Sequence, residues 1–324
     1  MKIALDIMGG DYAPLEAIKG VKKFFDEDPN QYGVHMLLIG NMEQAAEYLP
    51  MLDAHKGHFT LIDAPEMIDM HEHPTKALKE KPNSSISIGF GLLAKEKADA
   101  FISAGNTGAM MVGSMYSVKT IEGILRPSII SPIPRADGGY NLLLDAGANA
   151  DCKPEHLVQF ADLGSLYTSK VWDVENPRVG LLNLGHEEGK GNLLCQAVYP
   201  LLKANKSINF IGNIEGRDMF LNKADVIVCE GFVGNVTLKM AESIHTIFTE
   251  RGIKDDFLHH FNFEIYGGTP ILGINKPVII SHGISHAMAF DNMIKAASKI
   301  VHSNLIEAFK SHFATTSTTT AATS

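Results

Sequence analysis

The stretch Ser103-Ala104-Gly105-Asn106-Thr107-Gly108-Ala109 follows an apolar run at 98–102 and precedes a helix-like run at 110–118. This pattern predicts a strand, a tight turn and a helix, which together direct backbone N–H groups and the positive helix end toward one point. The two glycines lack the Cβ atoms that would keep an anion off the backbone, while Asn106 and Thr107 add donors or a helix cap. The turn therefore favours an anion site, and a purely structural corner is the alternative.

Four later apolar runs end in the same kind of polar, glycine-containing turn. These turns are 145–149, 185–192, 212–218 and 230–236. Strands that alternate with helices favour a mostly parallel sheet with helices on both faces, and ligands bind at the C-terminal edge of such a sheet. We therefore predict an α/β fold in which 1–314 form one catalytic domain or two closely packed lobes. The low-complexity tail 315–324 is predicted to be disordered.

Composition narrows the function classes. The 324 residues are 45% hydrophobic and 20% charged with a formal net charge of -9, which disfavours nonspecific nucleic-acid binding and polybasic membrane binding.

Cys152, Cys195 and Cys229 are far apart, so neither a disulfide framework nor a thiolate zinc site is indicated. His71-Glu72-His73 has no partner ligands at a typical spacing, and we expect no metal. With no signal peptide and no apolar run near about 18 residues, a cytoplasmic protein is expected.

Lys190 lies in a loop, Gly185-His186-Glu187-Glu188-Gly189-Lys190-Gly191-Asn192, that narrowly misses the phosphate-binding P-loop motif. The glycine spacing is too short, and Gly191 stands where Ser or Thr should bind magnesium, so ATP is not implied. A flexible lysine beside glycines still suits an oxyanion or phosphate as a mobile point charge.

Other local patterns have structural alternatives. Asp11 follows the first predicted strand, where it either belongs to a ligand site or caps the next helix. The match of 89–94 to the dinucleotide fingerprint is rejected, because its glycines lie inside a predicted helix. The prolines in 126–135 predict a loop or an irregular edge, and one helix is predicted from about 286 to 310.

Six ordered motifs resemble those of bacterial phosphate acyltransferases of the PlsX type. They are 6–11, 103–109, 144–149, Lys153-Pro154-Glu155-His156, 212–218 and Gly231-Phe232-Val233-Gly234-Asn235-Val236, and the match runs from residue 1 to about 310. The resemblance implies that a fatty acyl group passes from acyl carrier protein to inorganic phosphate, giving an acyl phosphate at the first step of a phospholipid pathway. It also implies a homodimer and a fold similar to phosphotransacetylases and isocitrate-dehydrogenase-like enzymes.

The turns and the resemblance together nominate the site residues. Those assigned to chemistry are Lys190, Asn106 and Asp11. Those assigned to phosphate or acyl binding are Gly105, Thr107, Gly108, Asp145, Asn149, Gly189, Asn192, Asn213, Arg217, Gly234, Asn235 and His282. Lys76, Lys79 and Lys81 are assigned to docking of the acidic carrier protein, with a solvated helix face as the alternative. No cofactor is expected. At His186 the related proteins more often carry Thr or an acidic residue, so this histidine either assists proton transfer or only occupies space.

Two rival functions remain open at this stage. One is another phosphate-handling enzyme of similar fold, such as a short-chain phosphotransacetylase, and the other is a noncatalytic scaffold. A downstream membrane glycerol-3-phosphate acyltransferase is the expected partner for the product. Segment 240–266 looks shorter than the region that family members use to touch the bilayer. Its apolar stripes, Ile244, Ile247 and Phe248, then Phe257, Leu258 and Phe261, give a thin lipid signal, so peripheral membrane contact through a partner is expected.

Overall fold

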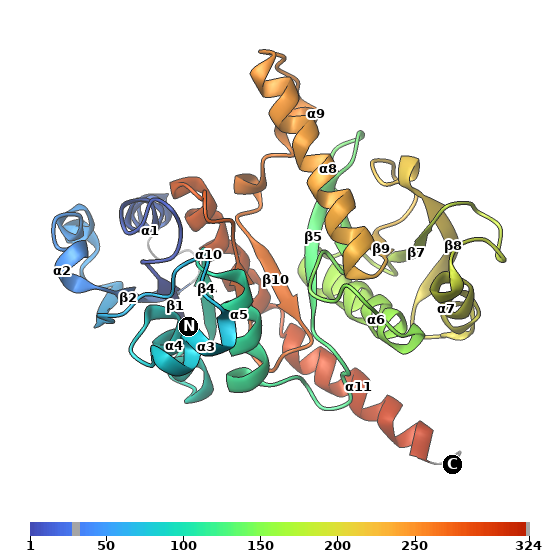
Figure 1. The fold of residues 1–324 in the computed structure, drawn as a ribbon, viewed down its shortest axis with the longest axis horizontal. Helices are drawn as coiled ribbons and strands as arrows, with labels where there is room; N and C mark the ends of the chain where they lie inside the picture. Colours follow the sequence, from blue (N-terminus) through green and yellow to red (C-terminus); the bar gives the residue numbers. More distant parts are fainter. Residues whose placement is uncertain (28–32, 322–324) are drawn as a thin grey trace. The chain divides into compact units, whose positions relative to one another are not determined.

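The computed structural model describes residues 1–27 and 33–321, which divide into two compact units. Unit 1 consists of Met1–Thr120 and Phe263–Ile306, and unit 2 consists of Ile121–Asn262 with the residues from Glu307 onward. Each unit contains paired strands covered by helices (Figure 1).

Unit 1 orders its strands β3-β2-β1-β4-β11-β10, all parallel except β10, which runs antiparallel to β11. Its elements are β1 (Lys2–Asp6), α1 (Leu15–Glu27), β2 (His35–Gly40), α2 (Met42–Ala45), η1 (Leu49–His55), β3 (Phe59–Asp63), α3 (Pro74–Glu80), α4 (Ser85–Ala94), β4 (Ala100–Ser103), α5 (Thr107–Gly113), η2 (Ser114–Val118), η4 (Phe263–Ile265), β10 (Thr269–Leu272), β11 (Val278–Ile280) and α10 (Ala287–His302).

The central strands of unit 1 are mostly apolar between their ends because helices cover both faces. Helices α1 and α10 lie on one face and α4 on the other (Figure 1), and β1, β2 and β4 are almost fully buried. Gly89 lies inside α4, as predicted, where an added Cβ would come within 2.3 Å of the Phe101 ring. This glycine therefore permits close packing of helix on sheet.

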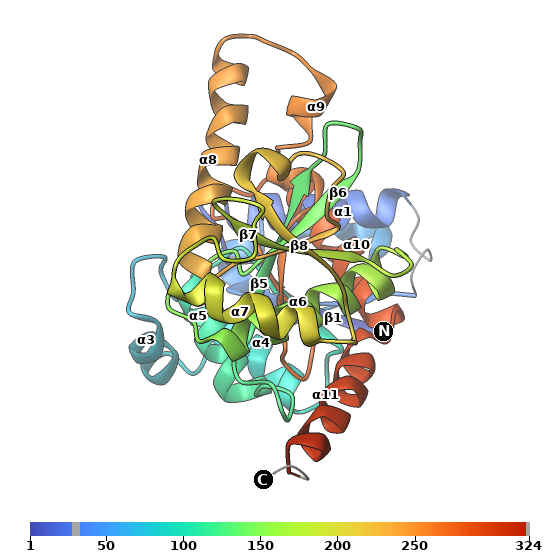
Figure 2. The same ribbon diagram turned by 90° about the vertical axis from the view of Figure 1, so that its right-hand side faces the viewer.

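Unit 2 orders its strands β5-β6-β9-β7-β8, with β5 antiparallel to β6 and the other neighbours parallel. Its elements are β5 (Ser128–Pro134), β6 (Tyr140–Leu144), α6 (Pro154–Val171), β7 (Arg178–Asn183), α7 (Leu193–Ala204), β8 (Asn209–Glu215), η3 (Gly216–Asp218), β9 (Val226–Val228), α8 (Gly231–Glu250) and α9 (Asp256–His259). Figure 2 shows α6 and α7 covering this unit's strands, and α8 extending away from them with α9 near its far end.

The structure confirms the predicted α/β fold with mostly parallel strands, and Cys229 is a buried core residue of unit 2. Two predictions were wrong. The proline-rich stretch forms strand β5 instead of a loop. Successive residues of a strand direct their N–H groups to opposite sides, so Pro132 and Pro134 both lie where the missing N–H would point away from β6, and the pairing with β6 is not interrupted. The single helix expected at 286–310 is two helices, α10 and α11 (Leu305–Ala321), separated at Asn304, whose φ is 53°.

Helix α11 continues past residue 314, where the catalytic domain was predicted to end. Residues 322–324 lie outside the described residues, so the disorder of 315–324 stays a prediction. Within 1–27 and 33–321, no helix is both long and apolar enough to cross a membrane.

A charged pair joins the N-terminal ends of β7 and β9 in unit 2. The Arg178 guanidinium donates from Nε to Asp225 Oδ2 and from Nη2 to Asp225 Oδ1, both at 2.9 Å, and the Arg178 backbone N–H reaches Oδ2 at 2.8 Å. Burial alone would raise the pKa of Asp225, but the hydrogen bonds and charge of Arg178 hold this pKa below its ordinary value.

Because its folded-state pKa is depressed, Asp225 contributes stability above the unfolded-state pKa of about 3.9 and loses it as the pH falls through the folded value. We expect Asp225→Asn to lower the free energy of unfolding by about 1–3 kcal/mol at neutral pH, with the deficit shrinking in acid. Denaturant titrations at neutral pH and near pH 3 measure this. The control is Asp53→Asn, which removes an exposed pair with Lys56 and should cost less than about 1 kcal/mol. An Asp225→Asn deficit that is independent of pH would contradict the prediction.

Candidate functional site

A buried carboxylate fixes the turn after β4. Asp6, at the end of β1, accepts a hydrogen bond from Ser103 Oγ at 2.7 Å and another from the Met8 N–H at 2.9 Å. Ser103 Oγ in turn accepts from the Gly105 N–H at 2.9 Å. Burial raises the pKa of Asp6, and these hydrogen bonds oppose the rise. Sequence patterns did not predict the pair because its members are 97 positions apart.

The Asn106 side chain is occupied by structural hydrogen bonds. Its Nδ2 donates to the carbonyl oxygens of Asp69, Met70 and Glu72 at 2.9–3.2 Å, and its Oδ1 accepts from the Ala109 N–H at 2.9 Å. Asn106 is therefore the N-cap of α5 and the anchor of loop 69–72. Direct contact of Asn106 with phosphate stays a prediction, because the amide hydrogens point at this loop here.

The loop after β1 is tied to the loop after β11. The Asp11 N–H donates a hydrogen bond to the Gly283 carbonyl oxygen at 2.7 Å. Gly10 has a φ of 101°, and a Cβ at this position would lie only 2.9 Å from the same oxygen, so a larger residue would not fit. The alternative that Asp11 caps α1 is wrong, since α1 begins only at Leu15, and the Asp11 side chain is exposed.

Unit 1 therefore gathers six of the nominated residues at the ends of three neighbouring parallel strands, β1, β4 and β11. The residues that follow these ends are Asp11, Gly105, Asn106, Thr107, Gly108 and His282. Thr107 is exposed, Gly108 lies against Pro74, and the His282 ring lies 4.4 Å from that of Phe263.

Asp145 is the buried centre of the turn after β6 in unit 2. Its carboxylate accepts hydrogen bonds from the backbone N–H groups of Ile129, Gly147, Ala148 and Asn149 and from Asn149 Nδ2, at 2.6–3.3 Å. Burial raises the pKa of Asp145, while these donors favour the charged form. Asn149 Nδ2 also reaches the Pro127 carbonyl. Asp145 and Asn149 thus hold the turn itself, and their roles as substrate ligands stay predictions.

The start of α8 packs directly on this turn. A Cβ at Gly234 would lie 1.8 Å from the Asp145 carbonyl oxygen, so only glycine fits. Asn235 Nδ2 contacts the Ala146 carbonyl at 3.4 Å, and the Glu230 carboxylate accepts from the first N–H groups of α8. Gly234 and Asn235 are therefore beside Asp145, but the N–H groups at this helix end already have a partner, and the binding roles of both residues stay predictions.

The loop that carries Lys190 is tied to the ends of β7 and β8. Asn183 Nδ2 donates to the Lys190 carbonyl at 3.1 Å and to Asn213 Oδ1 at 3.1 Å, and Asn213 Nδ2 donates to the Glu187 carbonyl at 2.8 Å. The nominated Asn213 is thus buried and structural, and Asn192 caps α7 through Oδ1. Gly189 and Lys190 are exposed, and within the described parts of the chain the Lys190 ammonium forms no ion pair.

A cluster of alternating charges lies where β8 ends. Arg217 pairs with Glu215 at 2.7 Å, and Lys223 pairs at 2.6 Å with Asp218, whose side chain is 1% exposed. The His186 ring faces both carboxylates. Arg217 was nominated from sequence, whereas Glu215, Asp218 and Lys223 were not, since nothing in their spacing reveals the pairing.

The three docking lysines differ in their surroundings. Lys76 and Lys79 are exposed on α3, and Lys76 is only loosely paired with Glu80 at 4.0 Å. Lys81 pairs with Glu72 at 2.7 Å and also donates to the Met67 carbonyl. Lys81 therefore anchors the loop before α3, while Lys76 and Lys79 stay exposed, and docking of the carrier protein on them stays a prediction.

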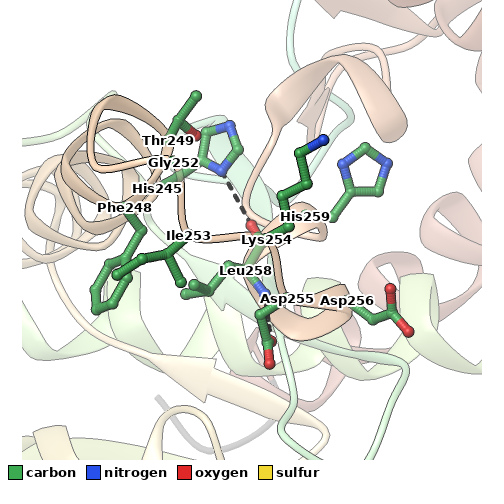
Figure 3. A pocket seen from close by; sticks show the side chains of 10 residues that line it. All are labelled: His245, Phe248, Thr249, Gly252, Ile253, Lys254, Asp255, Asp256, Leu258 and His259. Atoms are coloured by element: carbon green, nitrogen blue, oxygen red, sulfur yellow. Dashed lines mark hydrogen bonds between the residues drawn. The ribbon is translucent and has the colours of Figure 1, made fainter.

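A hollow of about 680 Å³ between α8 and α9 contains none of the nominated residues (Figure 3). Its walls include His245, Phe248, Lys254 and Asp255, and the His245 ring contacts the Leu258 carbonyl at 3.0 Å. Apolar and oppositely charged side chains alternate around it, so the hollow presents no single charge to a phosphate.

Comparison with known proteins adds to this geometry. A family described as fatty acid synthesis protein matches residues 1–308. A phosphate acyltransferase of Dictyoglomus thermophilum is 44% identical over 320 residues, covering 93% of this chain and 94% of that protein. One of Desulforamulus reducens is 44% identical over 328 residues, covering 96% of each.

Solved structures support the fold. A phosphotransacetylase from Streptococcus pyogenes superposes with a TM-score of 0.67 at 17% identity, covering 93% of this chain and 94% of that chain. A branched-chain phosphotransacylase from Enterococcus faecalis gives 0.64 at 14% identity, covering 93% and 99%. At these identities the likeness shows the fold alone.

The contacts of Asn106 predict an asymmetric response to removal of its amide hydrogens. Asn106→Asp keeps the cap on Ala109 but leaves the carbonyls of loop 69–72 facing a carboxylate, so the free energy of unfolding should fall by about 1–3 kcal/mol. Asn41→Asp is the matched control, because Asn41 caps α2 through its oxygen only, and it should stay within about 0.5 kcal/mol. If denaturant titrations gave the same loss of unfolding free energy for both variants, the hydrogen bonds donated by the Asn106 side-chain amide would contribute nothing to stability.

Proposed function

This chain belongs to the phosphate acyltransferase family, and we propose that it moves a fatty acyl group from acyl carrier protein to inorganic phosphate, forming an acyl phosphate for phospholipid synthesis. The observation that carries the proposal is 44% identity to phosphate acyltransferases over 93–96% of the chain. The chain also shares its fold with a phosphotransacetylase.

In the proposed reaction a phosphate oxygen attacks the thioester carbonyl carbon. The new C–O bond forms, the C–S bond breaks, and the carrier thiol leaves as a thiolate that takes up a proton. The protein must hold the phosphate and stabilise the oxyanion of the tetrahedral intermediate. Lys190 suits this task because it is an exposed cation on a loop whose backbone is anchored at both Glu187 and Lys190. Among the other nominated side chains, Thr107, Asp11 and Arg217 are exposed, and so are Asn192 and Asn235.

Donor choice tests the proposed function. Purified protein is incubated with phosphate and, in turn, palmitoyl carrier protein, palmitoyl-CoA and acetyl-CoA, and acyl phosphate is measured. We expect palmitoyl phosphate from the carrier-bound donor. Preference for acetyl-CoA would identify a short-chain phosphotransacetylase, and no product from any donor would favour a noncatalytic scaffold.

Lys190→Ala should impair the use of phosphate. Loss of one well-placed contact to a developing oxyanion costs on the order of 100-fold in rate, and a lost ground-state contact appears as a higher phosphate KM. Steady-state kinetics with phosphate varied measure both. Lys206→Ala removes another exposed lysine of unit 2 and should behave as the parent protein does. Unchanged phosphate kinetics in a folded Lys190→Ala protein would remove Lys190 from the site.

Lys76 and Lys79 are proposed as the electropositive patch that meets the acidic carrier protein. A chain with a net charge of -9 needs such local compensation, and its effect is mainly on association rate. Lys76→Glu with Lys79→Glu should raise the KM for the acyl carrier protein at low salt, and the effect should fade as salt is added. Lys95→Glu with Lys97→Glu makes the same charge change on another exposed segment. Equal KM values for the two double variants would place docking elsewhere.

The exposed face of α8 bears on the proposed homodimer and on membrane contact. Phe232, Val236, Met240 and Ile247 lie on one side of this helix and are 52–64% exposed. The second predicted lipid stripe does not face outward in full, because Phe261 is buried against Phe220 and Phe257. We assign the α8 face to the second copy rather than to lipid, since nearby charged residues 250–256 carry a net charge of -1. Delivery to the membrane glycerol-3-phosphate acyltransferase would then depend on a protein partner.

Liposome sedimentation and size-exclusion chromatography separate these assignments. We expect weak sedimentation with neutral and anionic liposomes, and we expect Met240→Asp with Ile247→Asp to shift the dimer toward monomer. Strong liposome binding that this double variant abolishes while the dimer stays intact would show that the α8 face is a membrane anchor.

A further inference from the structure

Two exposed leucines stand at the two ends of the loop that carries Lys190. Leu184 directly follows β7 and is 71% exposed, and Leu193 is the first residue of α7 and is 86% exposed. Among the large hydrophobic residues in the described parts of the chain, Leu193 is the most exposed. A single exposed leucine is ordinary on a protein surface. Two of them on one loop, at the sheet edge where ligands bind, form a shared apolar surface.

The loop closes on itself between these leucines. Asn183 Nδ2 donates to the Lys190 carbonyl at 3.1 Å, and a Cβ at Gly191 would lie 2.4 Å from Asn183 Oδ1. Asn183 immediately precedes Leu184, and Gly191 lies two residues before Leu193. Both leucines therefore emerge from the same closed base of the loop.

The shape of this loop does not depend on any one residue. Side chains of β8 and α7 also hold it: Asn213 donates to the Glu187 carbonyl, Gln196 donates to the Gly191 carbonyl, and Lys203 pairs with the Glu188 carboxylate. A loop held at this many points presents its side chains in place before a ligand arrives, which lowers the entropy cost of binding.

The Lys190 side chain lies beside Leu184. Its Cγ is 3.2 Å from the position that a Cβ on Gly185 would occupy, and Gly185 is the residue after Leu184. The Glu187 carboxylate approaches the same glycine, with Oε2 at 3.0 Å. A small anion would meet this lysine with a carboxylate nearby, whereas a ligand that joins an anionic group to an alkyl chain would also cover the leucines.

We propose that Leu184 and Leu193 bind the alkyl chain of the fatty acyl substrate, with its reacting end at Lys190, and thereby favour long chains over short ones. The inference rests on the proposed function, because it takes the ligand to be an acyl donor that becomes an acyl phosphate. Each methylene group removed from water favours binding by about four-fold, so even a short stretch of chain on the two leucines separates long from short donors.

A comparison of donor chain lengths tests the proposal. The kcat/KM for palmitoyl carrier protein is divided by that for butyryl carrier protein, so that effects common to both donors cancel. We expect Leu184→Gln with Leu193→Gln to lower this ratio by about ten-fold or more, and Leu193→Gln alone to lower it less. Leu184→Met with Leu193→Met keeps the surface apolar and should keep the parent ratio. Leu201→Gln is the matched control, because Leu201 is 44% exposed on the same helix, eight residues beyond Leu193.

Ligand binding without turnover gives a second measurement. Calorimetry with dodecyl phosphate, kept below its micelle concentration, and with butyl phosphate compares two chains on the same head group. The parent protein should bind dodecyl phosphate at least about ten-fold more tightly, and the double Gln variant should lose most of that difference. Size-exclusion chromatography should show the same oligomeric state for both proteins.

The inference is overturned if the double Gln variant keeps the parent chain-length ratio, or if Leu201→Gln or the double Met variant lowers the ratio equally. A changed oligomeric state with an unchanged ratio also overturns it and assigns the leucines to a contact between copies. Failure of the parent protein to form acyl phosphate overturns the proposed function instead, and the binding of dodecyl phosphate then decides the role of the leucines by itself.

Discussion

The buried Asp145 carboxylate is the interaction on which unit 2 depends most. Where β6 ends, the chain turns sharply and its N–H groups lose their strand partners, yet burial forbids leaving them unpaired. One carboxylate accepts three of these N–H groups, the Ile129 N–H of β5 and a side-chain amide. Because its donors come from the turn and from β5, Asp145 fixes both elements together. The start of α8 approaches this turn through Gly231 and Gly234, where a Cβ would meet the backbone of Asn149 and of Asp145.

Unit 1 solves the same problem with the same chemistry. Asp6 lies at the end of β1 and accepts a hydrogen bond from the Ser103 hydroxyl of β4. The same hydroxyl accepts a hydrogen bond from the Gly105 N–H and so fixes the position of Gly105. Asn106 completes the arrangement by holding loop 69–72 and capping α5. In both units the polar residues nearest the strand ends therefore support the loops, while Lys190, Asp11 and Thr107, one step further along, are exposed to solvent.

The same separation between supporting and exposed residues is seen among the positively charged side chains. A chain with a net charge of -9 must handle phosphate and an acidic carrier protein, so a few local cations matter more than the total charge. Several lysines and arginines in and near these loops are already paired, as Lys81, Arg178, Arg217 and Lys223 show. The exposed Lys190 stands out against that background, and its loop is held by neighbours that keep the backbone in place without neutralising the ammonium.

The sequence by itself determined the α/β class, most of the strands, the gathering of polar turns at strand ends and, through its ordered motifs, the family. These features are local: they follow from apolar periodicity and from the small set of residues that tight turns accept. The tertiary structure decided which polar residues are supports, since Asp6 meets Ser103 and Asp145 meets Ile129 only after the strands have paired. It also decided that Pro132 and Pro134 lie in a strand, because the side to which a strand directs its N–H groups is set by its neighbour. The partners of His186 could not be read from the sequence either, because they are about 30 positions away along the chain and only 3–4 Å away in space.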